Sequence, residues 1–183
     1  MKKLCSLVGL TMVLVACNQT PPQNTATPEQ APAPAAKAYG NLAQVMRGIP
    51  FPNSNLIFDT QTTDPGVAQK PAEGAGASAS AQFNSVYGGW QAVENAAIAL
   101  QETANLIMIP GCMCENGRPA PIANEDYRKF AAALADAGAA TLKAAQSKNL
   151  DAMVDVSGTV SEACAMCHEI YRDKPDVKDR CIP

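Results

Sequence analysis

The spacing of apolar residues in the second half of the chain restricts its fold more than any other feature. From Val86 to Ile107, apolar residues recur in alternating steps of four and three. This repeat places an apolar side chain on the same face of a helix at every turn. Two later stretches repeat the pattern, and no segment of useful length alternates apolar and polar residues as a half-buried strand does. The sequence therefore predicts an all-α protein.

Two long helices are expected after this one. The first of them should begin near Asn124, a residue type that favours helix starts, with Glu125 and Asp126 in its first turn. The other should begin after Asn149. Their apolar faces are expected to hold Tyr127, Phe130, Leu134, Ala137, Thr141 and Ala145 in the first case, and Met153, Val156, Val160, Ala163, Cys167 and Tyr171 in the second.

The first helix of the chain is expected to be interrupted. One face of it should hold Tyr39, Leu42, Val45 and Met46. Pro50 and Pro52 should break or kink the helix after these residues, with a further segment at residues 54–60 continuing it. The stretch 65–81 is rich in Gly, Ala and Ser and is expected to be a loop. Four amphipathic helices with otherwise short connections predict an antiparallel four-helix bundle.

Residues 1–16 are typical of a bacterial lipoprotein signal peptide. Lys2 and Lys3 precede an apolar run that is shorter than the about 20 residues needed to span a bilayer. The run ends in L-V-A-C at Cys17, which resembles the site where a lipoprotein signal is cut and the cysteine is lipidated. An ordinary signal peptide with a chance cysteine is the alternative. We expect a periplasmic protein that is anchored to a bacterial membrane through lipid on Cys17.

The lipidated cysteine is followed by a linker, so that residues 17–37 form a segment rich in Pro, Ala, Gln and Thr. Such a composition cannot bury a core, and a disordered tether to a domain of residues 38–183 is expected. The chain is acidic, with a net charge of −3, and loss of Lys2 and Lys3 would make it more negative. This balance argues against nucleic acid as a partner and favours cationic proteins.

The residues from Cys164 to His168 form the motif C-x-x-C-H, which is the pattern of covalent haem attachment. Two thiols three residues apart on a helix reach the two vinyl groups of one porphyrin, and the next residue offers its imidazole to the iron. A redox dithiol would instead follow a strand, and a zinc site would need more ligands, whereas His168 is the only histidine. We expect one haem c, bonded to Cys164 and Cys167 and ligated by His168.

The sixth iron ligand must come from upstream, because the 15 residues after His168 contain neither Met nor His. Met153 lies about 22 Å away along the same helix and is expected in the core. Met46 and Met108 both lie toward the end of the bundle that holds His168. We expect Met46 to bind the iron, with Met108 or an open iron as alternatives and core filling as the other role of both methionines. Arg47 would either pair with a haem propionate or be a solvated charge.

A helical, Ala-rich domain with this motif near its C-terminus resembles the class II cytochromes c, the cytochrome c′-like four-helix bundles. The resemblance covers about residues 38–174 and is carried by C-A-M-C-H-E-I-Y-R, which starts at Cys164. Low-spin members of that family take a methionine from the first helix, and high-spin members leave the distal side open. The interruption at Pro50 and Pro52 departs from the family pattern. The haem-binding residues that the resemblance implies are Cys164, Cys167, His168 and, on the first helix, Met46.

Three further cysteines lie outside the signal peptide, the lipidation site and the C-x-x-C-H motif. Cys112 and Cys114 lie in a loop at 110–121 that is an addition to the family pattern, at the end of the bundle where the chain terminates. In an oxidising compartment we expect Cys181 to form a disulfide with Cys112 or Cys114, and the sequence does not choose between them. The remaining thiol would be a candidate for linking a homodimer.

Three functions agree with these expectations. Met/His ligation keeps haem iron six-coordinate in both oxidation states and raises its potential, so we expect a carrier of single electrons between periplasmic proteins. The alternatives are a five-coordinate haem protein that binds a diatomic gas such as NO or CO, and a haem subunit of a larger oxidoreductase. An enzyme in its own right is not expected, because no acid/base pair or nucleophile accompanies the motif.

Overall fold

The structure, a computed structural model, describes residues 35–67 and 88–183. The expected signal peptide, the lipidation site at Cys17, most of the linker and most of the Gly/Ala-rich stretch lie outside the described residues. The regular secondary structure of the described part is helical apart from one isolated bridge between Met113 and Pro119. The all-α prediction is confirmed. None of the helices in this part is long and apolar enough to cross a bilayer.

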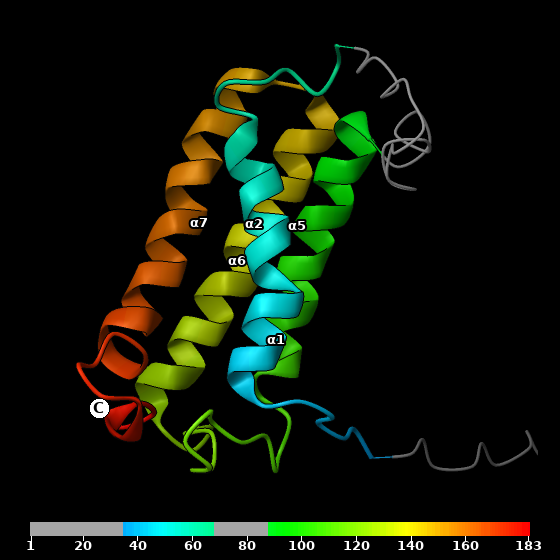
Figure 1. The fold of residues 1–183 in the computed structure, drawn as a ribbon. Helices are drawn as coiled ribbons and strands as arrows, with labels where there is room; N and C mark the ends of the chain where they lie inside the picture. The colour runs from blue at the N-terminus through cyan, green and yellow to red at the C-terminus, as the bar shows by residue number, and fades with distance from the viewer. Residues whose placement is uncertain (1–34, 68–87) are drawn as a thin grey trace, which may run out of the picture. The chain divides into compact units, whose positions relative to one another are not determined.

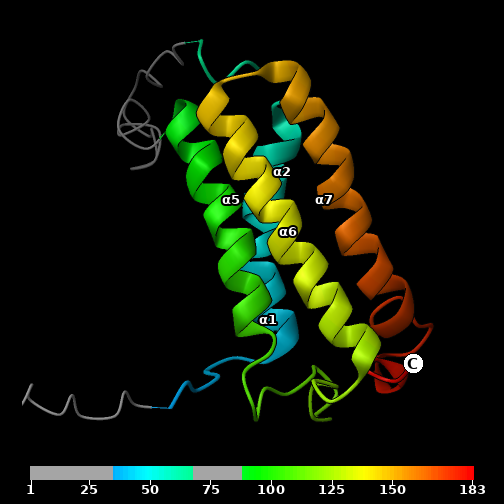
Figure 2. The same cartoon turned by 180° about the vertical axis from the view of Figure 1, so that it is seen from behind.

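The described residues form five α-helices and one short 3-10 helix. These are α1 (Leu42–Gly48), α2 (Pro50–Asp59), α5 (Gly89–Leu106), α6 (Glu125–Ser147), α7 (Leu150–Tyr171) and η1 (Val177–Asp179). Contacts between them close a ring, in which α2 touches α5, α5 touches α6, α6 touches α7, and α7 touches α2. The long helices lie side by side, and α1 lies at the same end as the C-terminal turns of α7 (Figures 1 and 2).

The first helix is divided at its prolines into α1 and α2. Asn41 caps α1, since its side chain accepts from the Gln44 amide while the Gln44 side chain accepts from the Asn41 amide, both at 2.9 Å. Pro50 is the first residue of α2, where the missing N–H costs no intrahelical bond. The second segment therefore starts at Pro50, before the predicted residue 54. Tyr39 was wrongly assigned to the helix face, because it precedes the cap and is 93% exposed.

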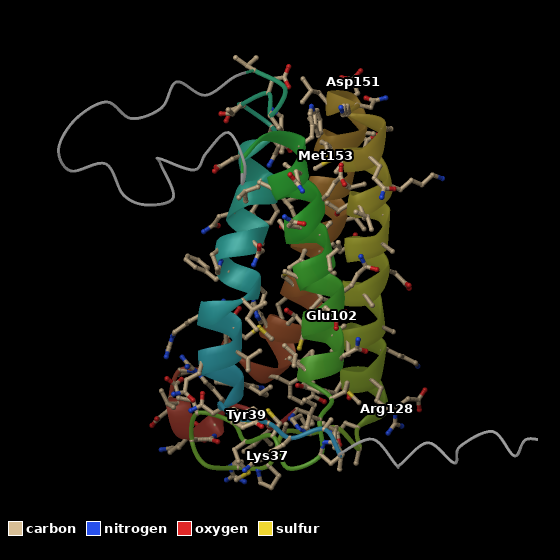
Figure 3. The ribbon with its side chains drawn as sticks, turned by 90° about the vertical axis from the view of Figure 1, so that its right-hand side faces the viewer. Lys37, Tyr39, Glu102, Arg128, Asp151 and Met153 are labelled. Atoms are coloured by element: carbon tan, nitrogen blue, oxygen red, sulfur yellow. A yellow bond between two sulfur atoms is a disulfide. The ribbon has the colours of Figure 1, made fainter. Side chains whose placement is uncertain are left out.

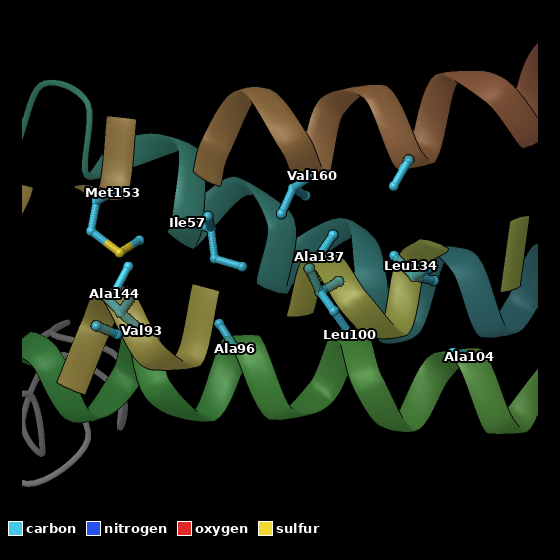
Figure 4. Packing of buried hydrophobic residues seen from close by; sticks show 12 residues of the cluster. Ile57, Val93, Ala96, Leu100, Ala104, Leu134, Ala137, Ala144, Met153 and Val160 are labelled. Atoms are coloured by element: carbon cyan, nitrogen blue, oxygen red, sulfur yellow. The ribbon is translucent and has the colours of Figure 1, made fainter. Parts of the chain in front are cut away.

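The predicted apolar faces of α5, α6 and α7 build most of the core. Side chains from all three helices, and from α2, converge in Figure 4. The predicted positions that are buried are Val93, Ala97, Leu100, Ala104, Ile107, Tyr127, Leu134, Ala137, Thr141, Ala145, Met153, Val160, Ala163 and Tyr171. Trp90, Phe130, Val156 and Cys167 are only partly buried. Val86 lies outside the described residues, and Ile107 is placed just beyond the end of α5.

Helices α5 and α6 pack so closely that one position between them has no room for a side chain. A Cβ atom added at Gly138 would lie 2.7 Å from Gln101 Cγ and 2.9 Å from the carbonyl oxygen of Ala97. Both distances are shorter than a van der Waals contact. The absence of a side chain at Gly138 therefore lets the two helix backbones approach each other.

Helix α7 begins at the end of the molecule opposite to α1. Its cap, Asn149, accepts a hydrogen bond from a backbone amide of the first turn. Figure 3 shows Asp151 and Met153 at the end opposite to Lys37 and Tyr39. The 22 residues of α7 extend for about 33 Å, so its last turns return to the end where α1 begins.

Candidate functional site

A cavity of about 650 Å³ lies between the first helices and the C-terminal turns of α7. Its volume is typical of a cofactor site, and its lining is mostly apolar. Cys164, Cys167 and His168 line it from α7, and Met46 lines it from α1. Met108 is not part of the lining. The structure thus brings the three motif residues and the expected methionine to one cavity.

The motif residues share one face of α7. Cys167 and His168 follow Cys164 by three and four positions, the spacings at which side chains are neighbours on a helix, and all three residues are half-buried. The helix ends directly afterwards, where the His168 carbonyl accepts hydrogen bonds from the amides of Arg172 and Asp173 at 2.8 and 2.7 Å. Burial, followed by the nearby Arg172 charge, lowers the pKa of His168. This shift favours the neutral imidazole, which is the form that binds metals.

The two motif thiols are poor nucleophiles in this environment. Burial raises the pKa of Cys164, and burial together with the charges of Cys164 and Asp126 raises the pKa of Cys167 to about 11. Reactive C-x-x-C cysteines have lowered pKa values and are commonly placed at helix N-termini. Because Cys164 and Cys167 lie at the C-terminal end of α7, this arrangement argues against a redox dithiol of the thioredoxin kind.

Aromatic side chains fix the last turn of α7 against α6. Tyr127 and Phe130 meet the Tyr171 ring edge-on, at centroid distances of 5.4 and 6.4 Å. The Tyr171 hydroxyl donates to Asp126 Oδ1 at 2.7 Å and accepts from Asn124 Nδ2 at 3.1 Å. The bond from Tyr171 holds the pKa of Asp126 below its usual value. Asn124 begins α6 as predicted, but its side chain binds Tyr171 in place of capping the helix.

A disulfide joins the loop after α5 to the C-terminal tail. Of the two partners left open for Cys181, the structure pairs Cys114. Cys112 is a free thiol with only 2% exposure, and burial raises its pKa. The Cys181 amide also donates to the carbonyl of Tyr171 at 2.8 Å. The tail is therefore held against the end of α7, beside the cavity that Cys181 helps to line.

A second set of bonds holds the same tail. The Asn116 side-chain amide donates to the carbonyl oxygens of Val177, Lys178 and Arg180, at 3.1, 3.2 and 2.9 Å. Residue 180 is the last before the disulfide cysteine, and its side chain also lines the cavity. The cross-linked loop and the tail thus form one rim of the cavity.

Charged side chains meet at this rim. Glu115 accepts hydrogen bonds from Arg47 Nη2 at 3.0 Å and from Arg180 Nη1 at 2.7 Å. The two guanidinium groups, with the bond from Arg47 as the largest influence, hold the pKa of Glu115 below its usual value. Arg47 was a candidate from the sequence, whereas Glu115 and Arg180 were missed. No local pattern marks those two residues, because their proximity depends on the folded tail.

The residues of the cavity fit a covalently held haem. The donor set is two thiols, one imidazole and one thioether, and His or Met ligation is typical of haem iron in cytochromes c. Among residues 35–67 and 88–183, no group of three or more His, Cys, Asp or Glu side chains is clustered as a metal-ion site. The Nε atom of Arg180 is buried without a hydrogen-bond partner, and a haem carboxylate is a suitable acceptor for it. Neither family models nor curated proteins nor solved structures match this chain.

Proposed function

We propose that this protein is an exported, membrane-tethered class II c-type cytochrome that carries single electrons with one covalently attached haem. The observation that carries this proposal is the shared cavity. The motif residues line it from α7 while Met46 lines it from α1. An imidazole and a thioether from different helices line one cavity, and these two groups would hold a haem iron there.

Each residue has a distinct role in this proposal. Bound haem would supply a one-electron couple between ferrous and ferric iron. Cys164 and Cys167 would retain the group through thioether bonds, and His168 would ligate the iron from the same helix. Met46 would ligate the iron from α1. Met108 is the weaker candidate for that position, because the cavity is lined by Met46 and not by Met108.

The proposal includes an antiparallel four-helix bundle in which α1 and α2 together count as the first helix. The ring of contacts among α2, α5, α6 and α7 supports this arrangement. Only Lys148 and Asn149 separate α6 from α7, and so short a connection is typical of antiparallel neighbours. Lys148 has the left-handed conformation, with φ of 52°, that commonly ends a helix before a sharp reversal.

Location and partners are inferred from the sequence. The signal-like segment 1–16 and the cysteine at position 17 support a lipid-anchored protein in the periplasm, the compartment where c-type haem is attached. The acidic net charge of the chain supports docking to cationic redox proteins by electrostatic steering.

The test is to produce the full-length chain in a bacterial host that assembles c-type cytochromes. The expected product carries one haem that remains attached on denaturation, and the reduced protein binds CO slowly and incompletely. A colourless protein with the mass of the bare chain would overturn the proposal. Rapid and complete CO binding would overturn Met46 ligation and favour the gas-binding alternative. Expression in a host without the attachment machinery provides the colourless control.

A further inference from the structure

The rim of the cavity contains an arginine whose hydrogen-bonding capacity is only partly used. Arg180 Nη1 donates to Glu115 at 2.7 Å, but Arg180 Nε is buried and has no partner. A buried donor without an acceptor costs free energy, and nearly all buried polar atoms in proteins are paired. The missing acceptor is therefore expected from the cavity that Arg180 lines.

The chemistry of a guanidinium defines which acceptor fits. Its donors are arranged in a planar fork that matches the two oxygens of a carboxylate. One side of the Arg180 fork already binds a carboxylate, that of Glu115, which also binds Arg47. Two guanidinium groups share one carboxylate here, so this small cluster has an excess of positive charge. A second carboxylate would both balance that charge and satisfy Nε.

The position of Arg180 is determined by the cross-linked tail. The contacts that hold the tail include the bond from Asn116 Nδ2 to the Arg180 carbonyl at 2.9 Å. The next residue, Cys181, is joined to Cys114 by the disulfide and has a left-handed backbone with φ of 63°, uncommon for a residue other than glycine. Constraints on both sides of Arg180 hold its backbone in place. The side chain is thus pre-organised at the rim.

We propose that Arg180 is a haem-binding residue that binds one propionate carboxylate through Nε. Arg47 and Glu115 complete the charged rim. This inference rests on the proposed function and adds a residue that lies outside the attachment motif. It also assigns a role to the Cys114–Cys181 disulfide, which holds Arg180 at the cavity. Because reduction adds an electron at the iron, the Arg180 charge should favour the ferrous state and raise the reduction potential.

The test compares full-length holoprotein variants by redox titration and by resonance Raman spectroscopy of the propionate bending band. Arg180→Gln should reduce the equilibrium constant for haem reduction about tenfold, which lowers the potential by about 59 mV, and should shift the propionate band. Lys178→Gln is the matched control. It removes a positive charge from the same tail, at a side chain that is 75% exposed and outside the cavity lining. It should change neither signal appreciably.

A second variant separates the hydrogen bond from charge and from folding. Arg180→Lys keeps the positive charge but lacks Nε, so it should largely retain the potential and still shift the propionate band. Helical content measured by circular dichroism identifies a variant that has lost its fold.

The outcomes distinguish the two proposals. Wild-type protein without haem would overturn the proposed function together with this inference. Protein that holds haem, but whose propionate band is the same in wild type, Arg180→Gln and Arg180→Lys, would overturn the role of Arg180 alone. Equal potentials for Arg180→Gln and Lys178→Gln would also overturn it, because the charge of Arg180 would then act no differently from a solvated surface charge.

Discussion

The two sides of this helical protein are packed by different means. Between α5 and α6, small residues bring the backbones together, to the point that Gly138 has no space for a Cβ atom. Between the first helices and the C-terminal turns of α7, a cavity of about 650 Å³ remains. Its walls carry large or polar side chains such as Phe58, Tyr127 and His168. Helix packing therefore leaves no free space between α5 and α6, which we call the closed side. It leaves a cavity between the first helices and α7, which we call the open side.

This difference separates the residues that stabilise the fold from those to which we assign haem binding. Two methionines illustrate this difference. Met153 is fully buried in the core near the beginning of α7, while Met46 is half-buried at the cavity. The closed side should respond to substitutions mainly through stability, and the open side mainly through haem attachment and ligation. Substitutions on each side can test that division.

The largest effect is expected at the attachment cysteines on the open side. Replacing both Cys164 and Cys167 by Ser should abolish covalent haem retention, because a hydroxyl does not form the thioether that a thiol forms. The measurement is haem staining and mass after denaturing electrophoresis. Cys112→Ser is the matched control, since this buried thiol lies outside the cavity lining, and it should retain attached haem. Haem that stays bound to the double variant on denaturation would contradict the assignment.

The two methionines should respond in opposite ways. Met46→Ala should convert the ferrous haem to a high-spin form that binds CO rapidly, with little loss of stability. Met153→Ala should leave the spectrum unchanged and reduce the free energy of unfolding by about 2–5 kcal/mol, because it leaves a cavity in the core. Optical spectra with CO and chemical denaturation measure the two effects.

An unchanged spectrum in Met46→Ala would move the sixth-ligand assignment to Met108 or to an open iron. The double variant Met46→Ala/Met108→Ala, compared with each single variant, decides between these two results. Met108 is a suitable comparison because it is partly buried but is not part of the cavity lining.

A pair of glycines tests how tightly the closed side is packed. Gly138→Ala should reduce the free energy of unfolding by about 1–3 kcal/mol, because the added methyl group would overlap Gln101 and the Ala97 carbonyl. Gly158→Ala, in the middle of α7 with no atom within 4 Å of the added Cβ, should stabilise by about 0.5–1 kcal/mol. Chemical denaturation measures both, and equal effects of the same sign would contradict the close contact of α5 with α6.

The smallest effect is a dependence of stability on acid pH at the junction of α6 and α7. The Tyr171 hydroxyl holds the pKa of Asp126 below its usual value of 3.8, so the unfolded chain takes up this proton first as the pH falls. The stabilising contribution should be complete above that value and lost as the pH falls below it. Asp126→Asn should weaken this dependence, which is measured by denaturation at pH 6 and at pH 3. An identical pH dependence in the variant would show that the Asp126–Tyr171 bond contributes no pH-dependent stability.

Local patterns predicted the helices well, because helix formation depends on residues three or four positions apart. The seam predicted from Val86 to Ile107 corresponds to α5, and the seams that begin at Tyr127 and Met153 correspond to α6 and α7. Their predicted faces form most of the core. Prediction was poorer in the first helix. Two short-range effects act there: the Asn41 capping box excludes Tyr39 from the helix, and Pro50 begins the second segment, whose start was predicted at residue 54.

The helical class, and the haem attachment proposed for the C-x-x-C-H motif, follow from the amino-acid sequence, because both depend on residues that are neighbours along one helix. The folded arrangement was needed to show that Met46, and not Met108, lines the cavity with His168, and that Cys181 pairs with Cys114. It was also needed to bring Arg180 to the rim. These relations join residues far apart in the chain, and their distances depend on how helices and tail pack together, which no local spacing specifies.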